Sequence, residues 1–249
     1  MNEVEIYQVL ASKSRLEILR LLYRKPFSVE ELSKATGLQP ITVRHHLQLL
    51  EETGFLESYE ERTGGIGRPK MYYKAAKQPP LLEFPKRQYL RLCSLLIGRM
   101  RSELGLSQTK KILKEVGLEL SENALKRLAL ENGVNEWSLK EFSELFINKY
   151  LKEFGAEPEI VEVDDKKIVY RMYNCVFLEL AKEAPEIICD ALYEGFNEGV
   201  SKVTDSKLRI RQLSCIGEGS PYCEYVCEQL TEEKNSRRQV FPTLRLNKS

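Results

Sequence analysis

Histidine is scarce in this sequence of 249 residues, which contains two of them, the neighbours His45 and His46. Adjacent residues of a helix diverge by about 100°, so the pair does not easily chelate one metal ion. With no third histidine, a histidine-rich catalytic metal site is excluded. A Ser/His/Asp set, a phosphate-binding loop and a carboxylate pair in a supporting context are also missing. We therefore expect no enzymatic activity.

Long apolar runs are missing too. No stretch of about 18 apolar residues occurs, so no transmembrane span is expected. Residues 1–5 lack the basic region and apolar core of a secretion signal, and we expect a cytoplasmic protein. The net charge of +1 does not by itself indicate nucleic-acid binding. Residues 1–80, however, carry more Lys and Arg than Asp and Glu, which is the sign that phosphate binding requires.

Residues 28–74 follow the order of a DNA-binding helix-turn-helix with a β wing. Ser28 and Glu31 have the spacing of a capping box at a helix start, and Gly37 provides the turn. Pro40 suits the first position of a second helix, which is expected to run to about residue 52. The apolar face of the first helix is expected to contain Val29, Leu32 and Ala35, and that of the second Ile41, Leu47, Leu49 and Leu50.

The second helix is the predicted recognition helix, and its other face is polar. The Gly-rich segment 64–67 lies between extended stretches 55–59 and 71–74, as in a wing. A further helix is expected to start near Ser14, with Glu17 as its capping-box partner, and to pack behind these two. Side chains that reach base edges or phosphates are expected to be Gln39, Thr42, Arg44, His45, Gln48, Arg68 and Lys70.

Three stretches of the N-terminal part of the chain resemble known regulators. Residues 11–19 and 42–47 are similar to ArsR/DeoR-type winged helix-turn-helix transcriptional regulators, and residues 67–73 resemble the wing of the iron–sulfur biogenesis repressors. The C-terminal third resembles cysteine-containing sensor domains of the vinyl-reductase-like, archaeal output-domain type, through residues 174–177, 184–189 and 215–223. The resemblance implies a DNA-binding regulator with a sensor domain.

The rest of the chain predicts an α+β fold with a helical connector and a C-terminal α/β sensor domain containing antiparallel strands. Helices are expected at 86–104, 107–116 and 121–131, then at 138–154 with a Ser138/Glu141 capping box. Alternation predicts strands at 159–163 and 167–173. A helical region is expected from residue 176, with a break at Pro185. Two more strands are expected at 207–215 and 222–229. The expected domains are 1–78 for DNA binding, 79–137 for the linker and dimer contact, 138–230 for the sensor, and a polar tail at 231–249.

Five of the six cysteines lie in the last third of the chain. Cys215 and Cys223 are equidistant from Gly219, so a hairpin centred there places them opposite each other, with Cβ atoms about 4.5–5.5 Å apart. Cys227 falls four residues further on, about 13 Å away. Cys175 and Cys189 join the same centre only if the chain folds back near Pro185. Cys93 is expected in the core.

Three readings of these cysteines stay open. Cys175, Cys189, Cys215 and Cys223 hold zinc or an iron–sulfur cluster, or they are structural or redox-active residues beside an apolar effector pocket, or they only fill the core. The first predicts a homodimeric regulator of double-stranded DNA controlled by a metal or cluster. The second predicts control by a small organic molecule. A thiol enzyme with Cys175 or Cys223 as nucleophile lacks a nearby base.

Overall fold

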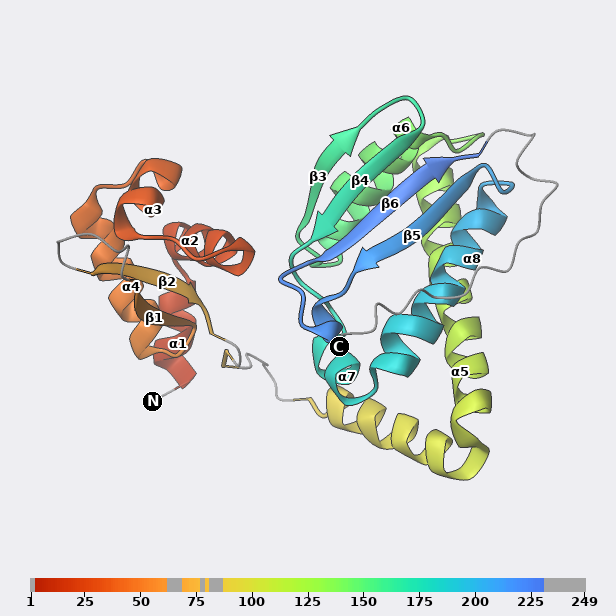
Figure 1. Ribbon diagram of the computed structural model, residues 1–249, viewed down its shortest axis with the longest axis horizontal. Coiled ribbons are helices and arrows are strands. Elements are labelled where there is room, and N and C mark those ends of the chain that lie inside the picture. The colour runs from red at the N-terminus through yellow and green to blue at the C-terminus, as the bar shows by residue number, and fades with distance from the viewer. Residues whose placement is uncertain (1–2, 62–68, 77–78, 81–86, 231–249) are drawn as a thin grey trace. The chain divides into compact units, whose positions relative to one another are not determined.

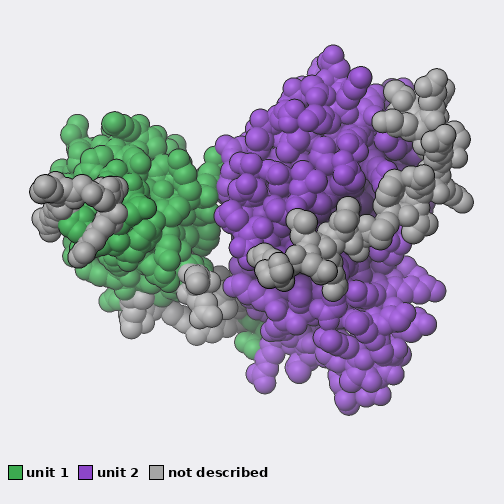
Figure 2. Space-filling view, in the orientation of Figure 1, with its two compact units in different colours: residues 1–89 green, residues 90–249 purple. Residues whose placement is uncertain are grey.

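The computed structural model describes residues 3–61, 69–76, 79–80 and 87–230. The chain divides into two compact units, Met1–Tyr89 and Leu90–Ser249, which Figure 2 shows in green and purple. Each unit is described by itself. Within the described residues, no helix has both the length and the apolar character needed to cross a membrane.

The first unit is a helical bundle with a two-stranded hairpin. Its core gathers one apolar face from each of four helices around Ile18, Leu32, Val43, Leu47 and Leu50, all at most 1% exposed. Its elements are α1 (Glu3–Leu10), α2 (Lys13–Arg24), α3 (Val29–Thr36), α4 (Pro40–Glu52), β1 (Leu56–Glu61) and β2 (Lys70–Ala75). The predicted helices and the antiparallel hairpin are confirmed, whereas α1 was not predicted.

The helix termini confirm one capping prediction and correct another. The Ser28 hydroxyl accepts from the Glu31 N–H and the Glu31 carboxylate accepts from the Ser28 N–H, so the capping box is complete. Gly37 ends α3 at φ +72°, a conformation that favours glycine. The expected Ser14 cap is wrong, because α2 begins at Lys13 and Ser12, at the N-cap position, makes no side-chain cap hydrogen bond.

Two apolar faces also differ from expectation. Ala35 is exposed, and Ile41 is 74% exposed, while Val43 takes the buried place in α4. Because successive residues of a helix are separated by about 100°, Ile41 lies nearly opposite Val43 and Leu50. Leu47 and Leu50 are buried as predicted, and Leu49 is partly buried.

The second unit begins with two helical segments where three helices were expected. α5 (Tyr89–Asn132) is broken at Gly105, whose φ of +77° and ψ of 164° are not helical, so the predicted break between residues 104 and 107 is confirmed. No new helix starts at Ser121. Its hydroxyl donates to the Leu118 carbonyl at 3.0 Å inside α5, a local bond that Ser makes in helix interiors. The linker expected at 79–137 is therefore largely a helix of the second unit.

A four-stranded antiparallel sheet in the order β3-β4-β6-β5 forms the other layer (Figure 1). The strands are β3 (Pro158–Val163), β4 (Lys167–Met172), β5 (Leu208–Ser214) and β6 (Cys223–Gln229). Their inward side chains, including Ile168, Tyr170 and Ile210, pack against Leu125 of α5 and Phe146. The mixed α+β fold predicted from the sequence is confirmed.

Two of the remaining helical segments have π geometry. The elements are α6 (Leu139–Glu141), η1 (Phe142–Leu151), α7 (Leu178–Glu183), η2 (Glu186–Leu192), α8 (Tyr193–Val203) and the 3₁₀ turn η3 (Ile216–Glu218). η1 and η2 are the π-helical ones, a rare form that is frequent at functional sites. The Ser138/Glu141 capping box ahead of η1 is present as predicted.

Candidate functional site

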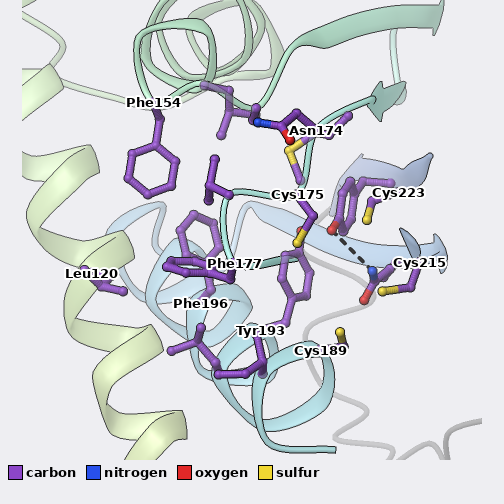
Figure 3. A pocket seen from close by; sticks show the side chains of 18 of the residues that line it. Leu120, Phe154, Asn174, Cys175, Phe177, Cys189, Tyr193, Phe196, Cys215 and Cys223 are labelled. Atoms are coloured by element: carbon purple, nitrogen blue, oxygen red, sulfur yellow. Dashed lines mark hydrogen bonds between the residues drawn. The ribbon is translucent and has the colours of Figure 1, made fainter. Parts of the chain in front are cut away.

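A cavity of about 110 Å³ lies in the second unit, between the helices and the sheet (Figure 3). None of the described residues that line it is Asp, Glu, Lys, Arg or His. Its polar side chains are Asn174 and Gln212, together with tyrosine hydroxyls and cysteine thiols. The aromatic lining residues are Phe146, Tyr150, Phe154, Tyr170, Phe177, Tyr193, Phe196 and Tyr225.

The aromatic wall comes from the spacing of residues on η1 and on the turn that follows it. Phe146, Tyr150 and Phe154 follow one another at intervals of four, which places them on one side of the helix. The Phe146 and Tyr150 ring centroids are 5.4 Å apart, and those of Tyr150 and Phe154 are 5.6 Å apart. Phe177 meets Phe154 edge-on at 6.2 Å. A continuous aromatic surface results, which suits the face of a flat apolar molecule.

A cluster of tyrosines forms the inner part of the cavity. The ring of Tyr225 on β6 stacks on Tyr170 at 5.3 Å and on Tyr193 at 4.8 Å. Burial raises the pKa of all three hydroxyls, so they are neutral at physiological pH. The Gln212 amide donates to the Tyr225 hydroxyl at 3.3 Å, the bond drawn in Figure 3. The cavity therefore combines aromatic surface with a few neutral hydrogen-bonding groups.

Four cysteines border the same cavity: Cys175, Cys189, Cys215 and Cys223. Cys215 follows β5 and Cys223 begins β6, next to the Ser214–Glu224 pair of the ladder, so they lie opposite each other as predicted. The backbone N–H of Ile216 donates to the Cys223 sulfur at 3.2 Å. The four thiols that the sequence singled out are thus brought to one place.

The path of the chain explains how Cys175 and Cys189 reach it. α7 ends at Ala184, whose φ of −145° and ψ of 67° are not helical, and η2 starts after Pro185. This break near Pro185 is the condition that the sequence set for the two residues to share a site. Gly217 leaves room for the sulfurs, since a Cβ there would lie 2.8 Å from Cys189 Sγ and 3.5 Å from Cys215 Sγ.

The thiols differ in their electrostatic environment. Hydrogen bonds from Cys189 and Cys223, supported by backbone N–H groups of η3, lower the pKa of the Cys215 thiol. The same bonds raise the pKa of Cys189 and Cys223, and burial raises that of Cys175. In the described part of the chain, no group of three or more His, Cys, Asp or Glu side chains has the arrangement of a metal site. Zinc or cluster ligation by these cysteines stays a prediction.

The two other cysteines do not line the cavity. Cys227 is fully buried in the core against the sheet, and burial raises its pKa to about 12. Cys93, expected in the core, is exposed on α5, so that prediction is wrong. The aromatic side chains that line the cavity were not predicted as a site, although the spacing Phe142, Phe146, Tyr150, Phe154 was readable. What the sequence did not indicate is that this stripe faces an unfilled space.

Close helix packing fixes one wall of the cavity to α5. Gly117 of α5 lies against the Leu192 carbonyl, and Leu192 and Phe196 line the cavity. Ion pairs between side chains continue along this contact, and their partners on η2 and α8 recur every four residues. They join Arg101 to Glu186 (3.0 Å), Lys110 to Asp190 (3.8 Å), Lys114 to Glu194 (2.8 Å) and Glu198 (2.6 Å), and Glu122 to Lys202 (2.5 Å). Leu120 of α5 itself lines the cavity.

The outward face of α4 in the first unit carries the residues predicted to contact DNA. Arg44, His45 and Gln48 are exposed, and Thr42 is partly buried. Gln39, exposed, is the N-cap residue and makes no side-chain cap hydrogen bond. Arg44 lies 3.8 Å from Glu30, with both side chains more than half exposed, and such a pair is weak enough to exchange for phosphate.

Two further residues bear on the DNA interface. Partial burial lowers the pKa of His46, which favours its neutral form. Lys70, the first residue of β2, is exposed with its ammonium 5.1 Å from the centre of the Tyr72 ring. Arg68 and the wing tip lie outside the described residues. The seven DNA-contact residues stay predictions.

Residues 10–59 match the family model described as a helix-turn-helix domain. The match covers α2, α3 and α4, three of the four helices that enclose the core of the first unit. The N-terminal unit contains a helix-turn-helix domain. The ArsR/DeoR assignment and the likeness to iron–sulfur repressors go beyond this match and remain predictions.

Comparisons with curated proteins and with solved structures say less about this chain than the family model does. No curated protein matches the chain. The phenol-responsive sensory domain of the transcription activator PoxR, solved with phenol, is 14% identical at a TM-score of 0.45, over 76% of this chain and 90% of that one. A trafficking protein particle complex subunit 3 from Naegleria fowleri, covalently bound to palmitic acid, is 10% identical at a TM-score of 0.41, over 59% and 98%. Neither likeness is close enough to establish the fold.

Proposed function

We propose that this protein is a DNA-binding transcriptional regulator whose operator affinity is controlled by a small uncharged organic molecule bound in the cavity of the second unit. The helix-turn-helix domain supports DNA binding. The observation that carries the choice of effector is the composition of the cavity wall, which is aromatic and aliphatic and contains no ionisable acid or base other than tyrosine and cysteine.

The lining chemistry limits what binds. A charged ligand in such a cavity loses its hydration without gaining an opposite charge, and that cost is many kcal/mol. A neutral apolar ligand gains burial at about 25 cal/mol per Å² of apolar surface. Cavities of on the order of 150 Å³ with apolar walls accept one benzene ring. A cavity of about 110 Å³ therefore suits a molecule of roughly one ring.

Control of DNA binding requires that the ligand favour one arrangement of the regulator over another. The cavity wall formed by η2 and α8 is fastened to α5 by the glycine contact and the ion pairs described above. α5 begins at Tyr89, where the two units meet in sequence. A shift of the cavity wall on ligand binding is passed, through the Arg101–Glu186 pair, to the segment of α5 before Gly105 that leads to the DNA-binding domain.

The proposed regulator is a homodimer on a pseudo-palindromic operator, since helix-turn-helix proteins commonly read two half-sites one DNA turn apart. The first half of α5 offers a surface for this contact, because Leu92, Leu95 and Leu96 are each more than half exposed. Sedimentation equilibrium of the wild type and of Leu95→Glu checks it: a dimer that dissociates in the variant is expected, and a monomeric wild type contradicts it.

Zinc or an iron–sulfur cluster held by Cys175, Cys189, Cys215 and Cys223 is the second candidate effector. The gathering of these thiols at one cavity favours it, although the described side chains do not have the arrangement of a metal site. Iron, sulfide and zinc are to be measured per chain after purification without oxygen, together with the visible spectrum. Near-equal iron and sulfide with charge-transfer bands supports the cluster. Preparations without metal support the organic effector.

The organic effector is tested with probes of one size and different charge. Toluene and phenol, which are neutral at pH 7, are expected to raise the melting temperature of the full chain by mass action, and benzoate is not. Ala156→Leu fills the cavity and is expected to abolish the effect. Ala129→Leu is the matched control, because Ala129 packs against the same core without lining the cavity. Equal responses to toluene and benzoate contradict the proposal.

A further inference from the structure

The most exposed apolar side chain of the helix-turn-helix domain lies on its recognition helix. Ile41 is the second residue of α4 and is 74% exposed. The hydrophobic pattern of the sequence placed it in the core, but Val43, Leu47 and Leu50 fill that face instead. A β-branched apolar residue facing water at this position contributes nothing to the core of the domain.

The helical period aligns Ile41 with the polar residues predicted to contact DNA. Arg44, His45 and Gln48 follow it at intervals of three, four and seven residues, which is the spacing of one helix face. All three are exposed. Ile41 stands at the N-terminal end of this row, and in helix-turn-helix proteins the N-terminal residues of the recognition helix contact base edges.

The chemistry of the major groove leaves one partner for such a side chain. Guanine, cytosine and adenine present hydrogen-bond donors and acceptors there, whereas thymine also presents its 5-methyl group, with which apolar side chains make contact. We propose that Ile41 is a base-reading residue that recognises the 5-methyl group of a thymine in the operator. The inference rests on the proposed DNA-binding function and specifies how part of the operator is chosen.

The size of the effect follows from the groups involved. Burying one methyl-sized group is worth about 0.8 kcal/mol, which corresponds to about a fourfold change in the dissociation constant. Replacing the contacted thymine by deoxyuridine removes only the methyl group and keeps every hydrogen bond of the base pair. The wild-type protein is therefore expected to lose about fourfold in affinity at that position.

The experiment starts with a duplex selected from a random pool by the full chain. Each thymine is then replaced in turn by deoxyuridine, and dissociation constants are measured by fluorescence anisotropy at fixed salt. Ile41→Ala is expected to bind the thymine and deoxyuridine duplexes equally at the position, one in each half-site, where the wild type discriminates. Ile41→Val keeps part of the contact and is expected to retain part of the discrimination. Val4→Ala, an exposed apolar change on α1, is the control and leaves the wild-type profile unchanged.

The outcomes separate this inference from the proposed function. Discrimination that disappears with Ile41→Ala at one thymine of each half-site supports it. A wild type that discriminates at no thymine, or an Ile41→Ala variant that keeps the wild-type profile, overturns it while DNA binding stands. Selection that enriches no duplex overturns the proposed function itself, and the role of Ile41 with it. Unfolding curves of Ile41→Ala, expected to match those of the wild type because the side chain is exposed, show that the variant is folded.

Discussion

Gly117 of α5 has no room for a side chain, and its replacement by alanine perturbs both the fold and the cavity. A Cβ built there would lie 2.9 Å from the Leu192 carbonyl carbon and from the Phe196 nitrogen, and closer still to the Leu192 carbonyl oxygen. These are backbone atoms, so no rotamer change relieves the contact. The two helices must move apart, and they carry Leu192 and Phe196 of the cavity wall with them.

The magnitude follows from a comparison with Gly98, a glycine in the other segment of α5, before the break at Gly105. Overpacking a close-packed core costs about 1–3 kcal/mol, occasionally more, and contact with a backbone carbonyl belongs at the upper end. Gly98, also in α5, has no atom within 4 Å of the position that a Cβ would take. Alanine there stabilises a helix by about 0.5–1 kcal/mol. We therefore expect the two substitutions to differ by about 4 kcal/mol, with opposite signs.

The assay is chemical and thermal unfolding of the full chain, monitored by circular dichroism, with Gly98→Ala as the matched control. A loss of about 3 kcal/mol corresponds to a fall of roughly 6–12 °C in the melting temperature of a domain of this size. Gly117→Ala is also expected to weaken binding of toluene, because the cavity wall is displaced. Stabilities of the two variants within about 0.5 kcal/mol of each other would refute the tight helix contact and the coupling of α5 to the cavity.

Further predictions concern a cap, a buried carboxylate and the thiols. Ser28→Ala removes a capping-box hydroxyl and is expected to cost about 1 kcal/mol in urea unfolding of the first unit; no loss contradicts the observed cap. Hydrogen bonds from two lysines hold the pKa of Glu122 below its usual value. The ionised carboxylate therefore stabilises the folded protein at pH values above the ordinary carboxyl pKa, and this stabilisation is lost as the pH falls through the lowered pKa of the folded state. The melting temperature of Glu122→Gln should therefore fall less steeply on acidification than that of the wild type, and parallel curves would count against the bridges. Maleimide is expected to label Cys93 at once in the native protein and Cys227 only after unfolding, as counted by mass spectrometry.

The sequence was most informative where structure is decided locally. The capping box at Ser28, the turn at Gly37 and the start of α4 at Pro40 depend on a few neighbouring residues, and they appear where they were predicted. The strands of the second unit followed from alternation of apolar residues in the same way. The local rule that serine starts a helix failed at Ser121. This residue is buried at the contact with Gly199 of α8, and α5 continues through it.

Only the tertiary structure decided which helix and sheet faces pack against each other. The sequence supplied four cysteines and a stripe of aromatic residues on η1, but the cavity they share exists because the sheet, η2 and α5 pack at particular distances. Ile41 was likewise predicted in the core of the first unit, but the packing of α4 buries Val43 and leaves Ile41 exposed. Side-chain periodicity fixes which residues share a face, whereas the fit of that face against its neighbours, summed over many weak contacts, decides which face is buried and where space is left.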